Sequence, residues 1–291
     1  MTQNGTTEEL ARALAGGEIQ AHFQPTVDLR SARVIGVEAL VRWAHPERGL
    51  VAPKEFLGVA EASGQMRPLT ERMIELATRT AGDWWRSGLG LQLSLNLPSS
   101  LFAQPEWQLH EFVSRAMNDS GLPGGALQFE VTEAAVMTDP ELASRTLTLL
   151  SEAGATISVD DFGTGLFSLS GLISLPIDEL KVDQSFIGEL TESDEHKMIV
   201  RSTIHLAHQM GLRVVAEGVE TEDTWRQLRS MGCERAQGFL IAKPLPAREI
   251  PAWLAAWNQR ARELRSTSRS RFGKAAEASK PAAGSPAEAP A

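Results

Sequence analysis

The amino-acid sequence predicts an α/β protein, a TIM-like (β/α)8 barrel that forms a single domain. About eight short segments, in which apolar and polar residues alternate as in a strand, are separated by segments with helical periodicity. This order indicates βα units around a parallel sheet. These units occupy most of the 291 residues, and a (β/α)8 barrel typically needs about 250 residues. A doubly wound open sheet is the second choice.

Composition indicates a globular protein that does not act on nucleic acid polymers. The chain is 42% hydrophobic and 22% charged, which suffices for a large core. Its formal net charge of -9 argues against a protein that grips a nucleic acid backbone, because such a protein needs clustered Lys and Arg. A single cysteine, Cys233, permits no internal disulfide and fits a reducing compartment.

The sequence also bears on where the protein acts. Its N-terminus lacks the positive and apolar regions of a secretory signal. No segment approaches the roughly 20 apolar residues of a membrane span. We therefore expect a cytoplasmic protein with no membrane span.

The first seventeen residues are expected to form a helical lead-in to the barrel. Thr6 followed by Glu9 is the pattern of a capping box, and Gly16 ends the helix. The barrel itself is expected over residues 18–265.

Two strands are predicted next, at 19–29 and 33–43. Pro25 cannot donate a hydrogen bond to a sheet, so a bulge or a strand end is expected there. The two-residue period of the second strand places three side chains on one face: Glu38, Leu40 and Arg42.

Strands and helices then alternate along the chain. Helices are predicted at 53–63, 69–87, 140–153, 196–210, 222–231 and 247–264, several of them stopped by glycine. Strands are predicted at 91–97, 127–133, 156–160, 180–183, 213–217 and 234–237. From residue 266 the composition turns to Ser, Ala, Pro, Glu and Lys, so residues 266–291 are expected to be a disordered tail.

Oxygen donors and one lysine recur at the ends of the predicted strands. The carboxyl ends of barrel strands form the mouth, where active sites lie. Several carboxylates in one mouth would repel each other unless a cation neutralised them. The residues are Glu38, Asn96, Glu130, Asp160, Lys181, Glu217 and Gln237, with Asp161 directly after Asp160.

The donor chemistry favours Mg or Mn over Zn, because the donors are hard oxygens without a Cys or His cluster. Adjacent carboxylates such as Asp160 and Asp161 can hold two ions, as in enzymes that cleave phosphate esters. One ion would polarise the phosphoryl oxygen, and together they would generate the attacking hydroxide. Lys181 would orient that water or balance phosphate charge, and Arg42 is placed to contact a phosphate. Each group taken alone could equally be a solvated loop start.

These segments closely resemble the EAL-domain family, phosphodiesterases that hydrolyse the bacterial messenger cyclic di-GMP to linear pGpG. The resemblance covers roughly residues 10–257, with the motifs in the family's order and spacing. The motifs are EALVR at 38–42, LSLNLP at 93–98, FEVTE at 129–133, DDFGTG at 160–165, LKVD at 180–183, AEGVE at 216–220, and QGF at 237–239 with KP at 243–244.

The resemblance implies a site with two Mg or Mn ions, and it implies a homodimer. One ion would be ligated by Glu38, Asn96, Glu130 and Asp160. The second would be held by Asp161, with Asp160 bridging, while Glu217 and Gln237 complete the metal and water environment. Glu217 or Lys181 would be the base or the water-orienting group, and Glu133 would brace the loop after Asp161. The nucleotide site would be lined by Gln24, Leu40, Arg42 and Gln237.

One loop departs from the family pattern. After Gly165, active members usually carry an aromatic residue and then small ones, whereas this chain reads Leu166-Phe167. In the family this loop positions the second metal and touches the dimer interface. Two alternatives to an enzyme therefore stay open: a non-catalytic cyclic di-GMP receptor and a protein interaction module. The sequence shows no obvious attached sensor or cyclase domain, which predicts either a stand-alone EAL module or one regulated by a sensor or regulatory partner in trans.

Overall fold

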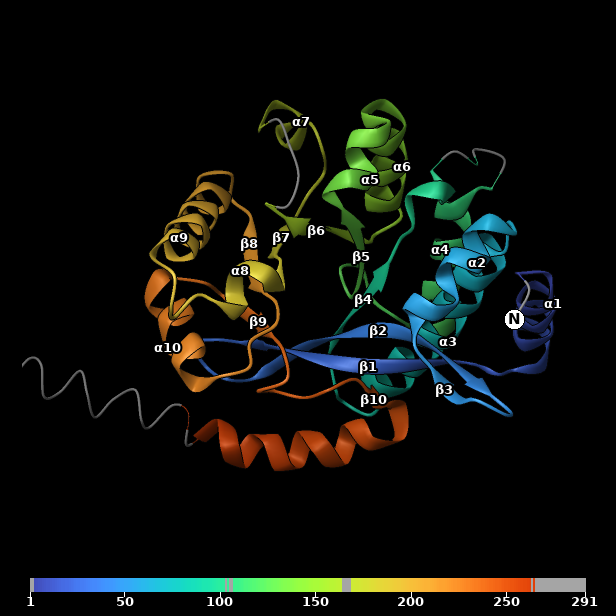
Figure 1. Cartoon of the computed structure of the whole chain (residues 1–291), viewed down its shortest axis with the longest axis horizontal. Coiled ribbons are helices and arrows are strands. Elements are labelled where there is room, and N and C mark those ends of the chain that lie inside the picture. Colours follow the sequence, from blue (N-terminus) through green and yellow to red (C-terminus); the bar gives the residue numbers. More distant parts are fainter. Residues whose placement is uncertain (1–2, 103, 105–106, 164–168, 263, 265–291) are drawn as a thin grey trace, which may run out of the picture.

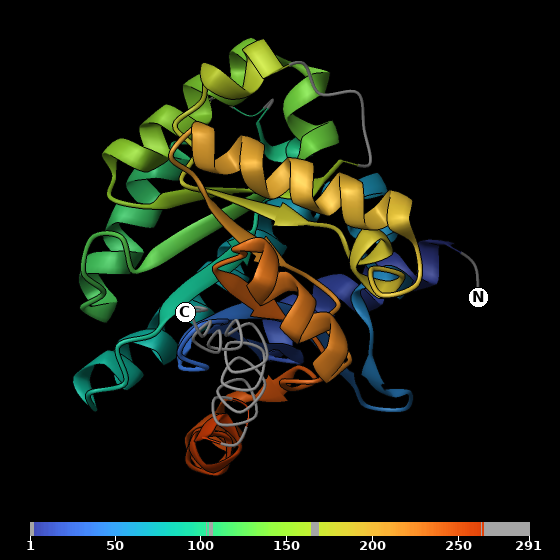
Figure 2. The same cartoon turned by 90° about the vertical axis from the view of Figure 1, so that its left-hand side faces the viewer.

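Eight strands form a closed ring with helices packed around its outside (Figures 1 and 2). The computed structural model describes residues 3–102, 104, 107–163, 169–262 and 264. The ring order is β1-β9-β8-β7-β6-β5-β4-β2, and pairing between β1 and β2 closes it. Closure confirms the predicted (β/α)8 barrel and excludes the open sheet. The predicted disordered tail and the Leu166-Phe167 segment lie outside the described residues.

The strands are β1 (Ile19–Asp28), β2 (Val34–His45), β3 (Gly49–Val51), β4 (Gln92–Asn96), β5 (Leu127–Thr132), β6 (Thr156–Phe162), β7 (Glu179–Val182), β8 (Arg213–Ala216), β9 (Arg235–Gln237) and β10 (Leu245–Pro246). The helices are α1 (Gln3–Gly16), α2 (Leu57–Ala62), α3 (Met66–Arg86), α4 (Leu109–Ser120), α5 (Glu133–Thr138), α6 (Pro140–Glu152), α7 (Leu169–Ile173), α8 (Gln184–Gly188), α9 (Asp194–Gln209) and α10 (Glu222–Met231). A last helix follows at 250–262, and no described helix is both long and apolar enough to cross a membrane.

The sequence predicted a parallel sheet, but one strand of the observed ring is antiparallel. Strand β1 runs antiparallel to both of its ring neighbours, β2 and β9. A parallel connection needs a crossover of a dozen or more residues. Only residues 29–33 join β1 to β2, so the chain must turn back, and the Asp28 side chain supports this turn by accepting the backbone N–H of Ser31. Of the two alternatives at Pro25, a strand end is wrong, because β1 continues through Pro25, whereas a bulge or irregularity does follow, between Thr26 and Val27.

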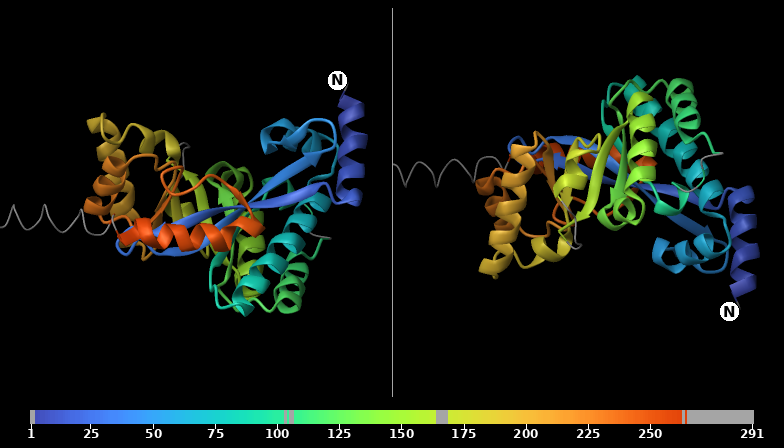
Figure 3. Two further views of the ribbon diagram at one scale, coloured as in Figure 1. Left: turned by 90° about the horizontal axis from the view of Figure 1, so that it is seen from below. Right: turned by 90° about the horizontal axis from the view of Figure 1, so that it is seen from above.

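Strands β1 and β2 form a long ribbon that reaches past the barrel to α1 (Figure 3). Its outer end is tied down by Glu18, which accepts the indole N–H of Trp43 at 2.9 Å. Its inner end carries Gln24 opposite Glu38 in direct register. The ribbon therefore delivers two polar side chains into the barrel from a pair of strands anchored in the periphery.

The barrel interior is polar, and the apolar core lies between the strands and the helices. Residues that alternate with the interior ones, such as Leu93, Phe129 and Val159, are fully buried on the outer face. At the amino ends of the strands, Glu179 accepts a 2.6 Å hydrogen bond from Arg235. Glu179 is 2% exposed, so this ion pair closes the lower end of the barrel without an apolar plug.

We expect Glu179→Gln to lower the free energy of unfolding by about 3 kcal/mol, because Arg235 would be left as a buried charge without its partner. Urea unfolding curves measure this change. Glu75→Gln, which breaks an exposed pair with Arg72 on α3, is the matched control and should change stability by less than about 0.5 kcal/mol. Equal effects of the two substitutions would contradict a structural role for the buried pair.

Candidate active site

One buried ammonium organises the mouth of the barrel. Lys181 projects from β7 and is 2% exposed. Four carboxylates from other parts of the ring lie within 4 Å of its Nζ atom: Glu217 at 2.6 Å, Glu130 at 2.8 Å, Asp160 at 3.5 Å and Glu38 at 3.8 Å. Since β2 lies opposite β7 in the ring, the lysine reaches across the whole barrel to approach Glu38.

Amide side chains hold Glu38 from the other directions. Asn96 donates to Glu38 Oε1 at 2.7 Å, and Gln237 donates to Glu38 Oε2 at 2.6 Å. Gln237 also lies 3.2 Å from the amide oxygen of Gln24, to which it donates. These contacts bring together side chains of β1, β2, β4 and β9, so residues that the sequence had placed at strand ends meet in one network.

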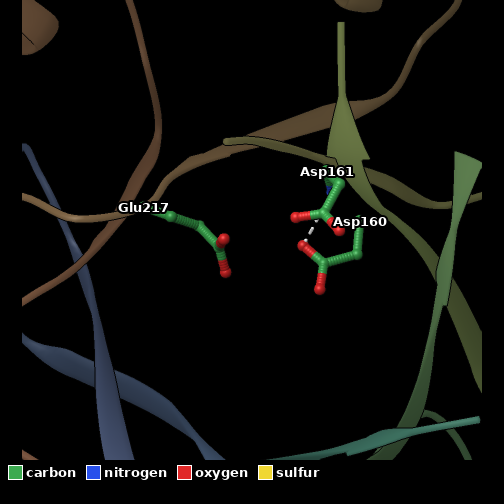
Figure 4. Close-up of side chains that lie close together, drawn as sticks. All are labelled: Asp160, Asp161 and Glu217. Atoms are coloured by element: carbon green, nitrogen blue, oxygen red, sulfur yellow. Dashed lines mark hydrogen bonds between the residues drawn. The ribbon is translucent and has the colours of Figure 1, made fainter. Parts of the chain in front are cut away.

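A bulge in β6 brings two consecutive carboxylates to the same space. Successive residues of a regular strand point to opposite faces. Here the pairing of β6 with β7 loses register between Val159 and Phe162, and Asp161 adopts a left-handed backbone with φ of 55°. An extra residue in a strand re-aims the side chains beside it. As Figure 4 shows, Asp160 and Asp161 consequently lie close together, with the Asp161 N–H bonded to Asp160 Oδ1 at 3.0 Å.

Glu217 faces this pair from the loop after β8 (Figure 4). Asp160, Asp161 and Glu217 each offer an oxygen, and these oxygens lie within 4.8 Å of one another. Carboxylate oxygens at this spacing suit a hard divalent cation. Among the described residues, this is the group of Asp, Glu, His or Cys side chains whose ligand atoms lie close enough together to hold a metal ion.

The electrostatics indicate a site that lacks positive charge. Burial raises the pKa of Glu217 to about 8, although Lys181 opposes the change. Burial and the charge of Asp160 raise the pKa of Asp161 to about 6. Burial would also raise the pKa of Glu38, but Lys181 and the two amides outweigh it and lower that pKa. Glu217 is therefore the carboxyl that retains its proton near neutral pH until a cation compensates its charge.

Glu133 connects this site to the chain that follows it. It is 2% exposed, and its Oε2 atom accepts the backbone N–H of Gly163 at 3.1 Å. Gly163 adopts φ of 99°, which favours glycine. This hydrogen bond fixes the path of the chain just past Asp161. The resemblance to the family implied such a bracing role for Glu133.

A cavity of about 540 Å³ opens beside the carboxylates, between the β2–β4 edge and helices α2 and α3. Its floor includes Glu38, Asn96 and Glu130, and its walls include Leu40. Met66, Leu69, Thr70 and Met73 of α3 also line it. These helical residues have the spacing of ordinary core positions, so their pattern in the sequence did not mark them as part of a site.

Arg42 and Asp183 are not among the residues that line this cavity. The guanidinium of Arg42 donates to the carbonyl of Val41 at 2.8 Å, burial lowers its pKa, and its contact with a nucleotide stays a prediction. Asp183 was missed as a site residue, although it shares a bond with Asp161 and raises the pKa of that carboxyl. Asp183 could have been predicted as a site residue from its position two residues after Lys181, directly after the end of β7.

Comparison with known proteins identifies the family. The family described as EAL domain has a sequence model that matches residues 7–244. The chain belongs to the EAL-domain family. The matched range contains all the residues that lie around Lys181.

Relatives and solved structures agree with this assignment. An uncharacterized protein of Azorhizobium caulinodans is 41% identical over 245 residues, which are 81% of this chain and 33% of that protein. The cyclic di-GMP phosphodiesterase NbdA of Pseudomonas aeruginosa is 38% identical over 251 residues, 86% of this chain and 32% of its own length. A structure of the PaMucR phosphodiesterase in complex with c-di-GMP is 37% identical, with a TM-score of 0.80 over 84% of this chain and 99% of that one. This EAL chain thus spans about a third of the length of the curated relatives it matches.

We expect the binding of Mn²⁺ at pH 7 to release at least about one proton, chiefly from Glu217, since a carboxyl with a pKa of about 8 is mostly protonated there. The release should decline toward zero as pH rises through 8 to 9. Calorimetry in two buffers of different ionisation enthalpy measures it. Glu217→Gln should lower the number by about one, and binding with no proton release at pH 7 would contradict the assignment.

Proposed function

We propose that this protein is a metal-dependent phosphodiesterase that hydrolyses cyclic di-GMP to linear pGpG. The observation that carries the proposal is the facing of Asp160, Asp161 and Glu217 around one space beside the buried ammonium of Lys181. The names of its relatives support the substrate, since NbdA is a cyclic di-GMP phosphodiesterase and PaMucR has been solved with c-di-GMP.

The residues present fit two hard divalent cations. When bound, Mg²⁺ or Mn²⁺ supplies Lewis-acid activation of the phosphodiester and of the attacking water. The first site would use Glu38, Asn96, Glu130 and Asp160, and the second would use Asp160, Asp161 and Glu217. Asn96 presents its amide N–H to Glu38 in this structure, so ligation through its oxygen requires that amide to rotate.

Lys181 and Glu217 would position and deprotonate the attacking water. Once bound cations have displaced its own proton, Glu217 would accept a proton from the attacking water, and the Lys181 ammonium, 2.6 Å from Glu217, would hold that water in place. Gln237 would fix the orientation of Glu38, and Gln24 would fix that of Gln237, through the hydrogen bonds that the Gln237 amide donates to both. Glu133 would hold the backbone after Asp161 at Gly163.

The cavity beside the carboxylates would take one nucleoside of the substrate. Its 540 Å³ fit a base and part of the ribose, and its apolar walls from α3 and Leu40 suit the faces of a guanine. Thr70 and Glu61, which also line it, offer hydrogen-bond acceptors for guanine N–H groups. Arg42, on the same face of β2 as Glu38 and Leu40, would approach a phosphate. We further propose that the protein acts in the cytoplasm as a homodimer.

Purified protein with Mg²⁺ or Mn²⁺ should convert cyclic di-GMP to pGpG, and a chelator should stop the reaction. Lys181→Met should lower kcat by about 10²- to 10⁴-fold, because the water loses its positioning group. Lys197→Met, which removes a lysine paired with Asp194 on the outer helix α9, is the matched control and should leave kcat unchanged. Chromatographic analysis of the nucleotide products gives these rates.

The same assay separates the alternatives. Binding of cyclic di-GMP with no product in the presence of either metal would identify a receptor instead of an enzyme. Absence of binding by titration calorimetry would favour an interaction module and would refute the proposed substrate.

A further inference from the structure

A second, much smaller cavity lies inside the barrel. Its volume is about 10 Å³, and its lining includes Glu130 and Lys181 of the mouth. The lining also includes Glu179 and Arg235, the ion pair that closes the lower end of the barrel. The cavity therefore lies between the two charged levels of the barrel interior.

One side chain in the wall of this cavity has a polar atom without a partner. Gln128 of β5 lines the cavity and is 1% exposed. Its Oε1 atom accepts the hydroxyl of Ser94 at 2.8 Å. Its Nε2 atom is buried and has no hydrogen-bond partner among the described residues. Leaving a buried donor unpaired costs free energy, and such groups are normally satisfied by protein or by ordered water.

A second polar group at this level also lacks a partner. Ser158 of β6 is fully buried, and its Oγ atom makes no hydrogen bond within the part of the chain that the structure describes. Its register neighbours are Glu130 on β5 and Glu179 on β7, both of which line the cavity. The two-residue period of a strand places Ser158 on the same face as Asp160, whose carboxylate approaches Lys181. The side chains at this level thus do not satisfy one another.

The size and charge of the wall select the ligand. A cavity of this volume has room for about one water molecule and for nothing larger. The carboxylates of Glu130 and Glu179 would repel an anion, whereas the charges of Lys181 and Arg235 would repel a cation. A neutral molecule that both donates and accepts hydrogen bonds meets these conditions, and at this size that molecule is water.

We propose that one water molecule is a fixed part of the barrel interior, where it accepts an N–H of Gln128 and donates to the carboxylates of Glu130 and Glu179. This water supports Glu130 from one side, while Lys181 contacts Glu130 Oε2 at 2.8 Å from the other. Gln128 acts on Glu130 through the water and is therefore a positioning residue. That role rests on the proposed function, in which Glu130 is a metal ligand.

A high-resolution crystal structure of the wild-type protein tests the water site. Density for one fully occupied water is expected within about 2.7–3.2 Å of Gln128 Nε2 and of carboxylate oxygens of Glu130 and Glu179. Gln128→Met, which is similar in size but has no N–H, should lack this density. Thr78→Val is the matched control, because it removes a buried hydroxyl that is already bonded to the carbonyl of Ile74 on α3. A wild-type cavity without density, or a protein group bonded to Gln128 Nε2 in place of water, would overturn the site.

Titration calorimetry with Mn²⁺ alone tests the positioning role. Gln128→Met should weaken Mn²⁺ binding by about tenfold, at the lower end of the loss that follows removal of a group that orients a metal ligand. Thr78→Val should bind Mn²⁺ as the wild type does, and thermal melting checks that both variants are folded. Unchanged affinity in folded Gln128→Met would overturn the positioning role. A wild type that binds no Mn²⁺ would refute the proposed function, whereas the crystallographic water would stand or fall by its own density.

Discussion

The contact of one buried ammonium with four carboxylates is the interaction on which the site depends. Lys181 extends from β7 across the barrel toward β2, and its charge allows Glu38, Glu130, Asp160 and Glu217 to share one interior. Removing one partner from a buried ion pair typically costs several kcal/mol. A single ammonium cannot neutralise this many acids, and burial accordingly raises the pKa of Glu217 to about 8.

Local departures from a regular (β/α)8 barrel place the remaining groups. The bulge in β6 and the left-handed Asp161 turn two consecutive carboxylates toward one cation site. The antiparallel β1 brings Gln24 next to Glu38, which a parallel strand with a crossover would place differently. A polar interior closed by the Glu179–Arg235 pair replaces the branched apolar layers usual in this architecture. The regular frame thus sets the position of the mouth, and its irregularities set the chemistry.

The sequence predicted the barrel and most of the residues that lie together at its mouth, because side chains at the carboxyl ends of ring strands must converge. Glu130, Asp160 and Lys181 follow from that rule alone. The direction of β1 was also accessible, since residues 29–33 are too few for a crossover. The bulge at Asp161 was not, because it depends on the register with β7. The cavity wall on α3 depends on tertiary packing, which helical periodicity does not encode.

Anomalous diffraction at the manganese edge, from crystals grown with Mn²⁺ and a non-hydrolysable cyclic di-GMP analogue, would locate the proposed metal ions. We expect two peaks at the mouth, one beside Glu38, Asn96 and Glu130 and one beside Asp161 and Glu217, with Asp160 between them. A mouth that holds the analogue but no manganese would contradict this expectation. So would a single ion that leaves Asp161 without a contact.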